Sequence, residues 1–303
     1  MRAPFHVFLT AALVTACGAD RHGRLRIGVA LPADSGAVTT DLRSGMAPVA
    51  DSLRLDVRIV TAGSDAGRQA AQVDSFTAQR VAAIVIDPVE PAALGDAIAH
   101  ANRAGVPIFT MVNAAGGGTS RIVSHIGSDD RMGGELAGWY VAHRLNSGGS
   151  IAILDQPGVP SARDRVAGIR LALTVFPNVR IVASPAVEPP ARDAARRRTA
   201  ALLASDQRVD AIVGTTDELA LGALDAVQTS GKPGVFVVGF GGAPEAREAI
   251  LKGSALVADV LPDPVTIGRY ALLVVASHLR GNQVLPSVPV RVHLVDRDSL
   301  QAQ

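Results

Sequence analysis

Cysteine is almost absent from this chain, with one copy, Cys17, among 303 residues. One cysteine and seven scattered histidines do not form a cluster with metal-ligand spacing. The sequence also contains no His-Glu-x-x-His, Gly-x-Ser-x-Gly or Walker-type phosphate loop. Gly239-Phe240-Gly241-Gly242 follows an apolar strand, but it lacks the third glycine of a dinucleotide loop. We therefore expect no metal, no cofactor and no enzymatic activity.

An excess of positive charge is equally lacking. Lys and Arg total 29 against 28 Asp and Glu, and removal of the predicted leader, which contains one Arg, makes the two totals equal. A chain without net positive charge lacks the basic surface that binds nucleic-acid phosphates, so we expect no nucleic-acid partner. The run Arg196-Arg197-Arg198 fans around a predicted helix and indicates a solvated face rather than an anion site.

The N-terminus has the pattern of an export leader. Met1 and Arg2 are followed by the apolar run Val7–Leu13, which is too short to span a bilayer permanently. Val14-Thr15-Ala16-Cys17 resembles a bacterial lipobox, in which the leader is cut before a cysteine that then carries a diacylglycerol. We predict a signal peptide at 1–16, lipid attachment at Cys17 and a lipid-anchored tether at 17–23. An ordinary cleaved leader that contains a cysteine is the alternative.

The rest of the chain alternates apolar strands with amphipathic helices. Hydrophobic residues make up 48% of the chain and charged residues 19%, which indicates well-packed cores. Val81–Ile86 is continuously apolar, which is typical of a parallel strand covered on both faces. The same alternation predicts, among other elements, a helix from Pro91 to Ala104, a strand at 122–126 and a helix from Asp130 to Leu145. Two successive sets of strand-helix units predict an α/β fold with two doubly wound parallel-sheet domains. Ligands of such sheets bind beyond the carboxyl ends of the strands.

Six short segments occur in an order that resembles one family. They are Asp87-Pro88-Val89, Ala104-Gly105-Val106-Pro107-Ile108, Val123 to Asp129, Ser161-Ala162-Arg163-Asp164-Arg165, Asp217 to Ala223 and Val237-Val238-Gly239-Phe240. Together they resemble the periplasmic ribose-binding protein family, whose fold is shared with the effector domains of lac-repressor-type regulators. Those regulators begin with a helix-turn-helix, whereas this chain begins with a leader and Cys17. The resemblance therefore points to the exported branch.

The resemblance implies two discontinuous lobes joined by a three-segment hinge, the type I periplasmic binding protein fold. The N-terminal lobe would comprise 24–128 and 263–290, and the C-terminal lobe 129–262 and 291–303. Rotation at the hinge would close the lobes over a ligand. We expect His125, near the first crossing, to be a structural hydrogen-bonding residue rather than a metal ligand.

The ligand contacts of the family are mostly replaced in this chain. Its two aromatic residues after the first strand correspond to Val38 and Thr39. Its other polar contacts correspond to Val112-Asn113, Thr216, Gly241 and Pro262. Buried polar groups of a sugar that find no partner cost about 1 to 3 kcal/mol each, so these replacements bear directly on which ligand fits.

Arg165 matches the family, and Asp87 stands where the family often has Asn. An arginine can donate two parallel hydrogen bonds to a pair of hydroxyl groups or to a carboxylate. The expected ligand-binding residues are Asp34, Ser35, Asp87, Asn113, Arg165, Thr216 and Gly241.

These observations predict an extracytoplasmic solute-binding lipoprotein of a sugar-type ABC importer. It would be a monomer, anchored at the periplasmic or extracellular face, and would bind a small polar ligand such as a carbohydrate and deliver it to an ABC permease. The alternative is a sensor or interaction protein of the same fold that has lost sugar binding and signals to a membrane receptor.

Overall fold

The computed structural model describes residues 23–115, 120–188 and 191–302, and these separate into two compact units. One unit extends to Ile126 and resumes at Val265–Val288; the other comprises Gly127–Pro264 and the described residues from Pro289 onward. The chain therefore passes between the units three times. Cys17, the predicted leader and nearly all of the predicted tether lie outside the described residues.

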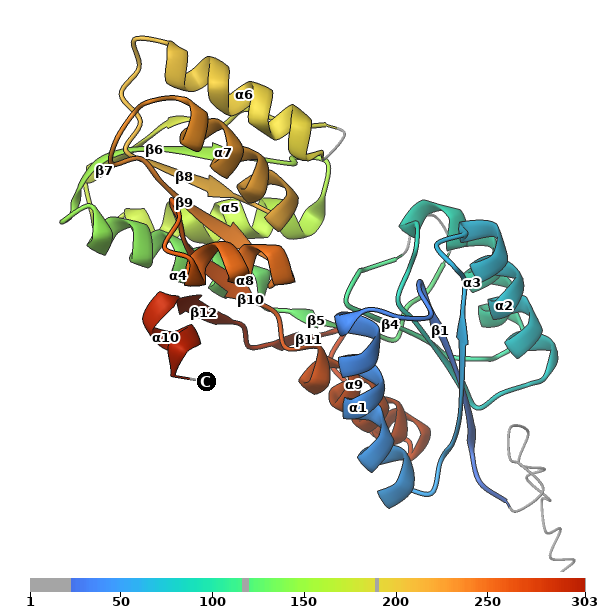
Figure 1. Ribbon diagram of the computed structural model, residues 1–303. Helices are drawn as coiled ribbons and strands as arrows, with labels where there is room; N and C mark the ends of the chain where they lie inside the picture. The colour runs from blue at the N-terminus through green and yellow to red at the C-terminus, as the bar shows by residue number, and fades with distance from the viewer. Residues whose placement is uncertain (1–22, 116–119, 189–190, 303) are drawn as a thin grey trace, which may run out of the picture. The chain divides into compact units, whose positions relative to one another are not determined.

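The first unit contains a six-stranded sheet with helices in alternation (Figure 1). Its elements are β1 (Arg26–Leu31), α1 (Ala37–Ser52), β2 (Asp56–Thr61), α2 (Ala66–Ala78), β3 (Ala83–Ile86), the 3₁₀ helix η1 (Pro91–Leu94), α3 (Gly95–Arg103), β4 (Ile108–Met111), β5 (Ser124–Ser128), α9 (Pro264–Leu279) and β11 (Ser287–Val290). Strands β1 to β5 pair in parallel.

The second unit repeats this construction. Its elements are α4 (Asp130–Arg144), β6 (Gly148–Leu154), α5 (Pro160–Leu173), β7 (Asn178–Ala183), α6 (Arg192–Ala204), β8 (Ala211–Gly214), α7 (Asp217–Thr229), β9 (Phe236–Phe240), α8 (Pro244–Leu251), β10 (Leu256–Leu261), β12 (His293–Asp296) and α10 (Arg297–Gln301). The strands from β6 to β10 pair in parallel, and β12 joins β10 antiparallel.

The two sheets share one strand order. The first runs β11-β5-β4-β3-β1-β2 and the second β12-β10-β9-β8-β6-β7. In the first sheet β1 lies between β2 and β3, and in the second sheet β6 lies between β7 and β8. The strand order therefore reverses beside β1 and beside β6. Such a reversal is where doubly wound sheets bind ligands, outside the carboxyl ends of the strands. The predicted α/β, doubly wound fold is confirmed.

In the first unit, helices cover both faces of the sheet. Ile84 and Ile86 of β3 pack with Phe76 of α2 and Ile98 of α3 in one core. Helices α1 and α9 lie side by side (Figure 1) because glycine permits their backbones to approach. A Cβ at Gly45 would stand 1.9 Å from the Val265 carbonyl oxygen.

Alternation along β6 divides the core of the second unit. Ile151 and Ile153 pack in the cluster that includes α4 and α5 residues, whereas Ala152 and Leu154 pack in the cluster that includes residues of α6, α7 and α8. Side chains of a strand point alternately to opposite faces, so this sheet is buried on both sides. The continuous apolar strands of the sequence have this physical origin.

Some boundaries differ from the sequence-based expectation. The segment expected as one helix from Pro91 to Ala104 begins as the 3₁₀ turn η1, where the Ala93 amide donates to the Glu90 carbonyl at 3.2 Å. The strand expected at 122–126 is found at Ser124–Ser128. Helix α9 and strands β11 and β12 were not predicted. In the part of the chain that the structure describes, no helix is long and apolar enough to cross a membrane.

Candidate functional site

Four of the predicted ligand residues belong to the first unit and follow three of its strands. Asp34 and Ser35 follow β1, Asp87 follows β3 directly, and Asn113 comes two residues after β4. Asp34 and Ser35 are exposed, and the Thr61 hydroxyl at the end of β2 donates to Asp34 Oδ1. Because the strands are parallel, these residues lie at one edge of the sheet.

Asp87 and Asn113 are in direct contact. Asn113 Nδ2 donates to Asp87 Oδ1 at 3.1 Å, and Asp87 is only 3% exposed. Burial raises the pKa of Asp87 to about 7, against the opposing effect of the hydrogen bonds from Asn113. Asp87 thus titrates near neutral pH, so it can accept a hydrogen bond as a carboxylate or donate one as an acid.

The backbone around Asp87 is fixed by Gln69, a fully buried residue of α2. Gln69 Nε2 donates to the Asp87 carbonyl at 2.8 Å, and Gln69 Oε1 accepts from the Val89 amide at 2.8 Å. The Asp87 amide in turn donates to the Ala30 carbonyl of β1 at 3.0 Å. A buried amide with its donor and acceptor both satisfied holds the strand end in one conformation.

The two positions that correspond to the family's aromatic residues lie at the start of α1. Val38 is 46% exposed, whereas Thr39 is buried and its hydroxyl is 3.4 Å from the Ala33 carbonyl. Neither side chain offers a ring to a ligand. At these two positions the first unit therefore has no aromatic face on which a sugar could stack.

In the second unit, Arg165 lies on α5 and its guanidinium is largely engaged. Nε and Nη2 contact Asp130 Oδ1 at 2.9 and 2.8 Å, and Nη1 donates to the Thr215 carbonyl at 2.6 Å. The guanidinium carbon also lies 3.7 Å from the centroid of the Phe240 ring, a cation–π contact. Arginine has five N–H donors, so one hydrogen on each of Nη1 and Nη2 has no partner among these contacts.

Thr216 and Gly241 follow the neighbouring strands β8 and β9. Thr216 is the N-cap of α7, and its hydroxyl accepts from the Leu219 amide at 3.4 Å. Gly241 is exposed and has φ of 155°, outside the usual range of residues with a side chain. The contact between Arg165 and Thr215 brings the α5 arginine to the edge that carries Thr216.

Sequence reasoning missed Asp130 and Phe240 as the partners of Arg165. Burial raises the pKa of Asp130, while Arg165 opposes the rise by favouring the carboxylate. Asp130 stands first in a helix that the sequence did predict, so an acidic residue at a helix N-terminus was the available signal. Nothing in the sequence pattern indicated that Arg165 would reach it.

His125 has the structural role expected of it. Its Nδ1 lies 3.0 Å from the Thr110 hydroxyl, and its backbone amide donates to the Pro286 carbonyl at 2.9 Å. Burial lowers the pKa of His125, which favours the neutral ring. Among the residues that the structure describes, no group of three potential metal ligands occurs.

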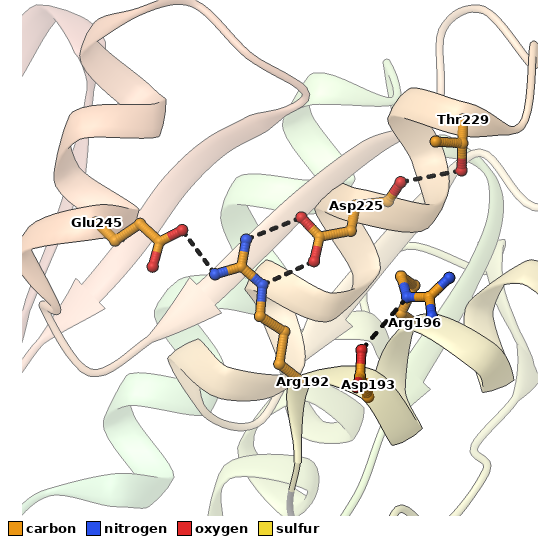
Figure 2. A network of polar contacts seen from close by, with 6 residues as sticks. All are labelled: Arg192, Asp193, Arg196, Asp225, Thr229 and Glu245. Carbon is orange, nitrogen blue, oxygen red and sulfur yellow. Dashed lines mark hydrogen bonds and ion pairs between the residues drawn. The ribbon is translucent and has the colours of Figure 1, made fainter.

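A cluster of ion pairs lies elsewhere in the second unit. Figure 2 shows Arg192 of α6 joined to Asp225 of α7 by two hydrogen bonds of 2.7 and 2.8 Å, and to Glu245 of α8 by one of 2.6 Å. Arg196 pairs with Asp193 of its own helix at 3.5 Å. These contacts tie three helices together and lie outside the predicted site.

The described cavities do not coincide with the predicted ligand residues. Two cavities of about 630 and 510 Å³ in the first unit share Ala82, Gly105 and Val106, which precede β3 and β4 at the opposite edge of the sheet. A third, of about 310 Å³, lies in the second unit beside Tyr140 and Arg144.

Residues 27–283 match the family described as periplasmic binding protein domain. The chain is 32% identical over 255 residues to the ribose import binding protein RbsB of Salmonella typhimurium, covering 84% of each chain. It is 30% identical over 245 residues to a xylitol-binding protein of Mycolicibacterium smegmatis, covering 79% of this chain and 69% of the relative.

The fold has a counterpart among solved structures. A periplasmic ribose ABC transporter protein from Conexibacter woesei superimposes with a TM-score of 0.83 at 22% identity, covering 94% of this chain and 95% of that one. At this level of identity the likeness shows the fold alone. It agrees with the two doubly wound sheets described above.

Proposed function

The chain belongs to the periplasmic binding protein domain family, and on that premise we propose that it is an extracytoplasmic solute-binding lipoprotein of a sugar-type ABC importer. Its ligand is a small polar molecule, a sugar or a polyol. The names of its relatives support this ligand class, because one imports ribose and another binds xylitol. They likewise support binding and transport rather than catalysis.

One observation in the structure carries the proposal. Asp87 and Asn113 form a hydrogen-bonded pair at the carboxyl ends of β3 and β4, and Gln69 holds the backbone of Asp87 in place. A fixed carboxyl beside an amide offers both donors and acceptors to adjacent hydroxyl groups of a polyol. The proposed contacts in the first unit are therefore Asp87, Asn113, Asp34 and Ser35.

In the second unit, the proposed contacts are Arg165, Thr216 and Gly241. The two N–H groups that Arg165 has not committed to Asp130 and Thr215 are available to a hydroxyl or a carboxylate. The proposal keeps the domain limits given above, 24–128 with 263–290 and 129–262 with 291–303, and treats the three crossings as a hinge. It also includes the signal peptide, the lipid anchor at Cys17, a monomeric state and a partner ABC permease.

A second candidate function follows from the replaced ligand residues. Val38 and Thr39 provide no ring, and Gly241 provides no side chain, so a pyranose would find fewer partners here than in a sugar site of the usual composition. A protein of this fold that has lost sugar binding would act as a sensor or interaction protein of a membrane receptor.

A thermal-shift screen of the purified chain distinguishes the importer's binding protein from the sensor. Sugars, polyols, nucleosides and acidic metabolites are tested in parallel, since a ligand at 100 times its dissociation constant stabilises the folded state by about 2.7 kcal/mol. Stabilisation by a sugar or polyol supports the importer. Stabilisation by none of these compounds, at millimolar concentration, contradicts it and favours the sensor.

A further inference from the structure

Two buried carboxyl groups, Asp217 and Asp259, lie beneath the loop that follows β9. Asp217 is the first residue of α7 and is 7% exposed; Asp259 is in β10 and is fully buried. Asp217 Oδ2 accepts from the Ala243 amide at 2.6 Å, and Asp259 Oδ2 accepts from the Gly242 amide at 2.8 Å. Each carboxyl group therefore holds one backbone amide of the same loop.

The two remaining oxygens, Oδ1 of Asp217 and Oδ1 of Asp259, lie beside the same residue, Gly239. A Cβ placed on Gly239 would stand 3.0 Å from Asp217 Oδ1 and 3.1 Å from Asp259 Oδ1, so both oxygens lie against the same open face of Gly239. The side chains are within hydrogen-bonding reach of each other, yet among the described residues no other donor reaches either oxygen. Two buried carboxylates in this arrangement would repel each other, and a proton on one of them both removes this repulsion and supplies a donor.

The surrounding charges do not remove the need for that proton. Arg165 is the cation that acts on Asp217, but its hydrogen bonds go to Asp130 and to the Thr215 carbonyl. Glu218 adds a further negative charge on the same helix. Burial raises the pKa of Asp217, and burial together with the neighbouring Asp217 raises the pKa of Asp259 to about 8.

We propose that Asp217 and Asp259 share one proton and, as a pair of positioning residues, fix the loop Gly241–Ala243 at the end of β9. The proton closes an acid–carboxylate hydrogen bond between the two Oδ1 atoms and leaves both Oδ2 atoms free to accept from the loop amides. No covalent bond changes, and the pair touches no ligand.

The same pair accounts for the glycine at position 241. A Cβ there would stand 2.5 Å from Asp217 Oδ2, the atom that holds the Ala243 amide. The space that a side chain at 241 would need is thus occupied by the Asp217 carboxyl group. The loop is positioned from beneath by Asp217 and Asp259 rather than by a side chain of its own.

The shared proton gives the second unit a defined pH dependence. A folded-state pKa raised above that of the unfolded chain means that the folded state binds more protons between the two values. Its contribution to stability is complete below the ordinary carboxyl pKa and is lost as pH rises through about 8. One proton changes the unfolding equilibrium constant by up to about tenfold per pH unit in that range.

The test compares the full chain with Asp259→Asn, without any ligand. The side-chain amide introduced by this substitution would donate to Asp217 Oδ1 while its oxygen accepts from Gly242, so the variant copies the protonated pair permanently. We expect its unfolding equilibrium constant to rise less steeply than the parent's between pH 6 and 8, by up to about tenfold per pH unit, whereas the rise that Asp87 contributes remains in both proteins. Carboxyl carbon NMR of the parent should show one protonated member of the pair at pH 6. Asp206→Asn, at an exposed position of the same unit, is the control and should keep the parent's rise.

Two further variants test the shared proton and the hydrogen bond to the Gly242 amide separately. Asp217→Asn should also make the unfolding equilibrium constant rise less steeply between pH 6 and 8. It replaces Asp259→Asn in the test if that variant does not fold. Asp259→Leu, which cannot accept from Gly242, should speed amide exchange at Gly242 and Ala243 at least tenfold, whereas Asp259→Asn should not. If both carboxyl groups are ionised at pH 6, or if Asp259→Asn keeps the parent's pH dependence, the proposal is wrong.

The inference rests on the proposed function only in one respect, that Gly241 is a proposed ligand contact. All of these measurements are made on the unliganded chain. Failure of the ligand screen therefore leaves the shared proton intact, and failure of the proton test leaves solute binding intact.

Discussion

The side-chain amide of Asn113 donates a 3.1 Å hydrogen bond to Oδ1 of Asp87, which is buried at the adjacent strand end. Two influences on Asp87 oppose each other there. Burial favours the neutral acid, whereas the donor on Asn113 favours the carboxylate, and burial dominates because the pKa of Asp87 rises to about 7. The protonation of this residue therefore changes within the physiological range.

The first prediction concerns this pair. Asn113→Ala removes the donor, so it should raise the pKa of Asp87 further and cost about 1 kcal/mol of stability at neutral pH. In the parent, the stability from the acid form of Asp87 is lost as pH rises through about 7, because the raised pKa favours the protonated folded state. Asp87→Asn should abolish that loss. Carboxyl NMR titration and denaturant unfolding at pH 5 to 9 measure both effects.

Asp51→Asn is the matched control, since Asp51 is an exposed carboxylate of α1 in the same unit. It should leave the pH dependence unchanged. An Asp87 pKa that stays the same or falls in Asn113→Ala would show that the amide does not act on the carboxylate.

The second prediction concerns Arg165 and Asp130. Removing Arg165 leaves a half-buried carboxyl group and the Thr215 carbonyl without their donor, so Arg165→Ala should destabilise the unliganded chain by about 1.5 to 3 kcal/mol. Asp130→Ala should destabilise it too, and the double variant should cost about 1 to 2 kcal/mol less than the sum of the two. Denaturant unfolding of all four proteins measures the coupling.

Ligand affinity is the second readout for Arg165. Calorimetry with the compound that stabilises the chain most should show binding weaker by about 10- to 150-fold in Arg165→Ala. Arg197→Ala, at an exposed position of α6, should change neither stability nor affinity. Unchanged affinity in Arg165→Ala would remove Arg165 from the proposed contacts, whatever its effect on stability.

The position of Asp87 could be predicted from the sequence, whereas the contacts of Arg165 could not. The apolar runs and their order predicted two doubly wound sheets, and hence placed Asp87, Asn113 and Thr216 at strand ends. Contacts between residues distant in sequence were not predictable, because no periodic pattern encodes them. Arg165 was expected to be free for a ligand, whereas Asp130, 35 positions earlier, takes part of its donor set. The Asp217 and Asp259 pair was missed for the same reason, since its members lie on different elements.

The third prediction concerns the packing that positions Arg165. Gly134 of α4 faces α5 so closely that a Cβ would stand 1.9 Å from the Arg165 carbonyl oxygen. Gly134→Ala must separate the two helices and should destabilise the chain by about 2 to 3 kcal/mol, within the range for overpacked cores. Gly95→Ala is the matched control, because nothing lies within 4 Å of its Cβ position and Ala favours the helix by about 0.4 to 1 kcal/mol. Thermal unfolding of both variants measures these effects. Equal melting temperatures of the two variants would contradict the close approach of α4 and α5 at Gly134.

The last prediction concerns Cys17, which lies outside the described residues. A lipobox cysteine carries its diacylglycerol through its own sulfur, and this chain has no second cysteine to replace it. Cys17→Ser should therefore abolish lipid modification, and either release the protein from the membrane or stop its processing. Each buried methylene contributes about 0.8 kcal/mol to membrane binding, so loss of two or more acyl chains changes the distribution of the protein completely.

Metabolic labelling with an alkyne fatty acid, followed by membrane fractionation, tests this expectation in a bacterial host. Thr10→Ser is the control, because it changes the leader conservatively and keeps the cysteine. The parent and Thr10→Ser should be labelled and should sediment with membranes, and Cys17→Ser should be unlabelled. Labelling that persists in Cys17→Ser would place the lipid on another residue. A parent chain that is exported without label, with its mature N-terminus identified by mass spectrometry, would establish the ordinary cleaved leader instead.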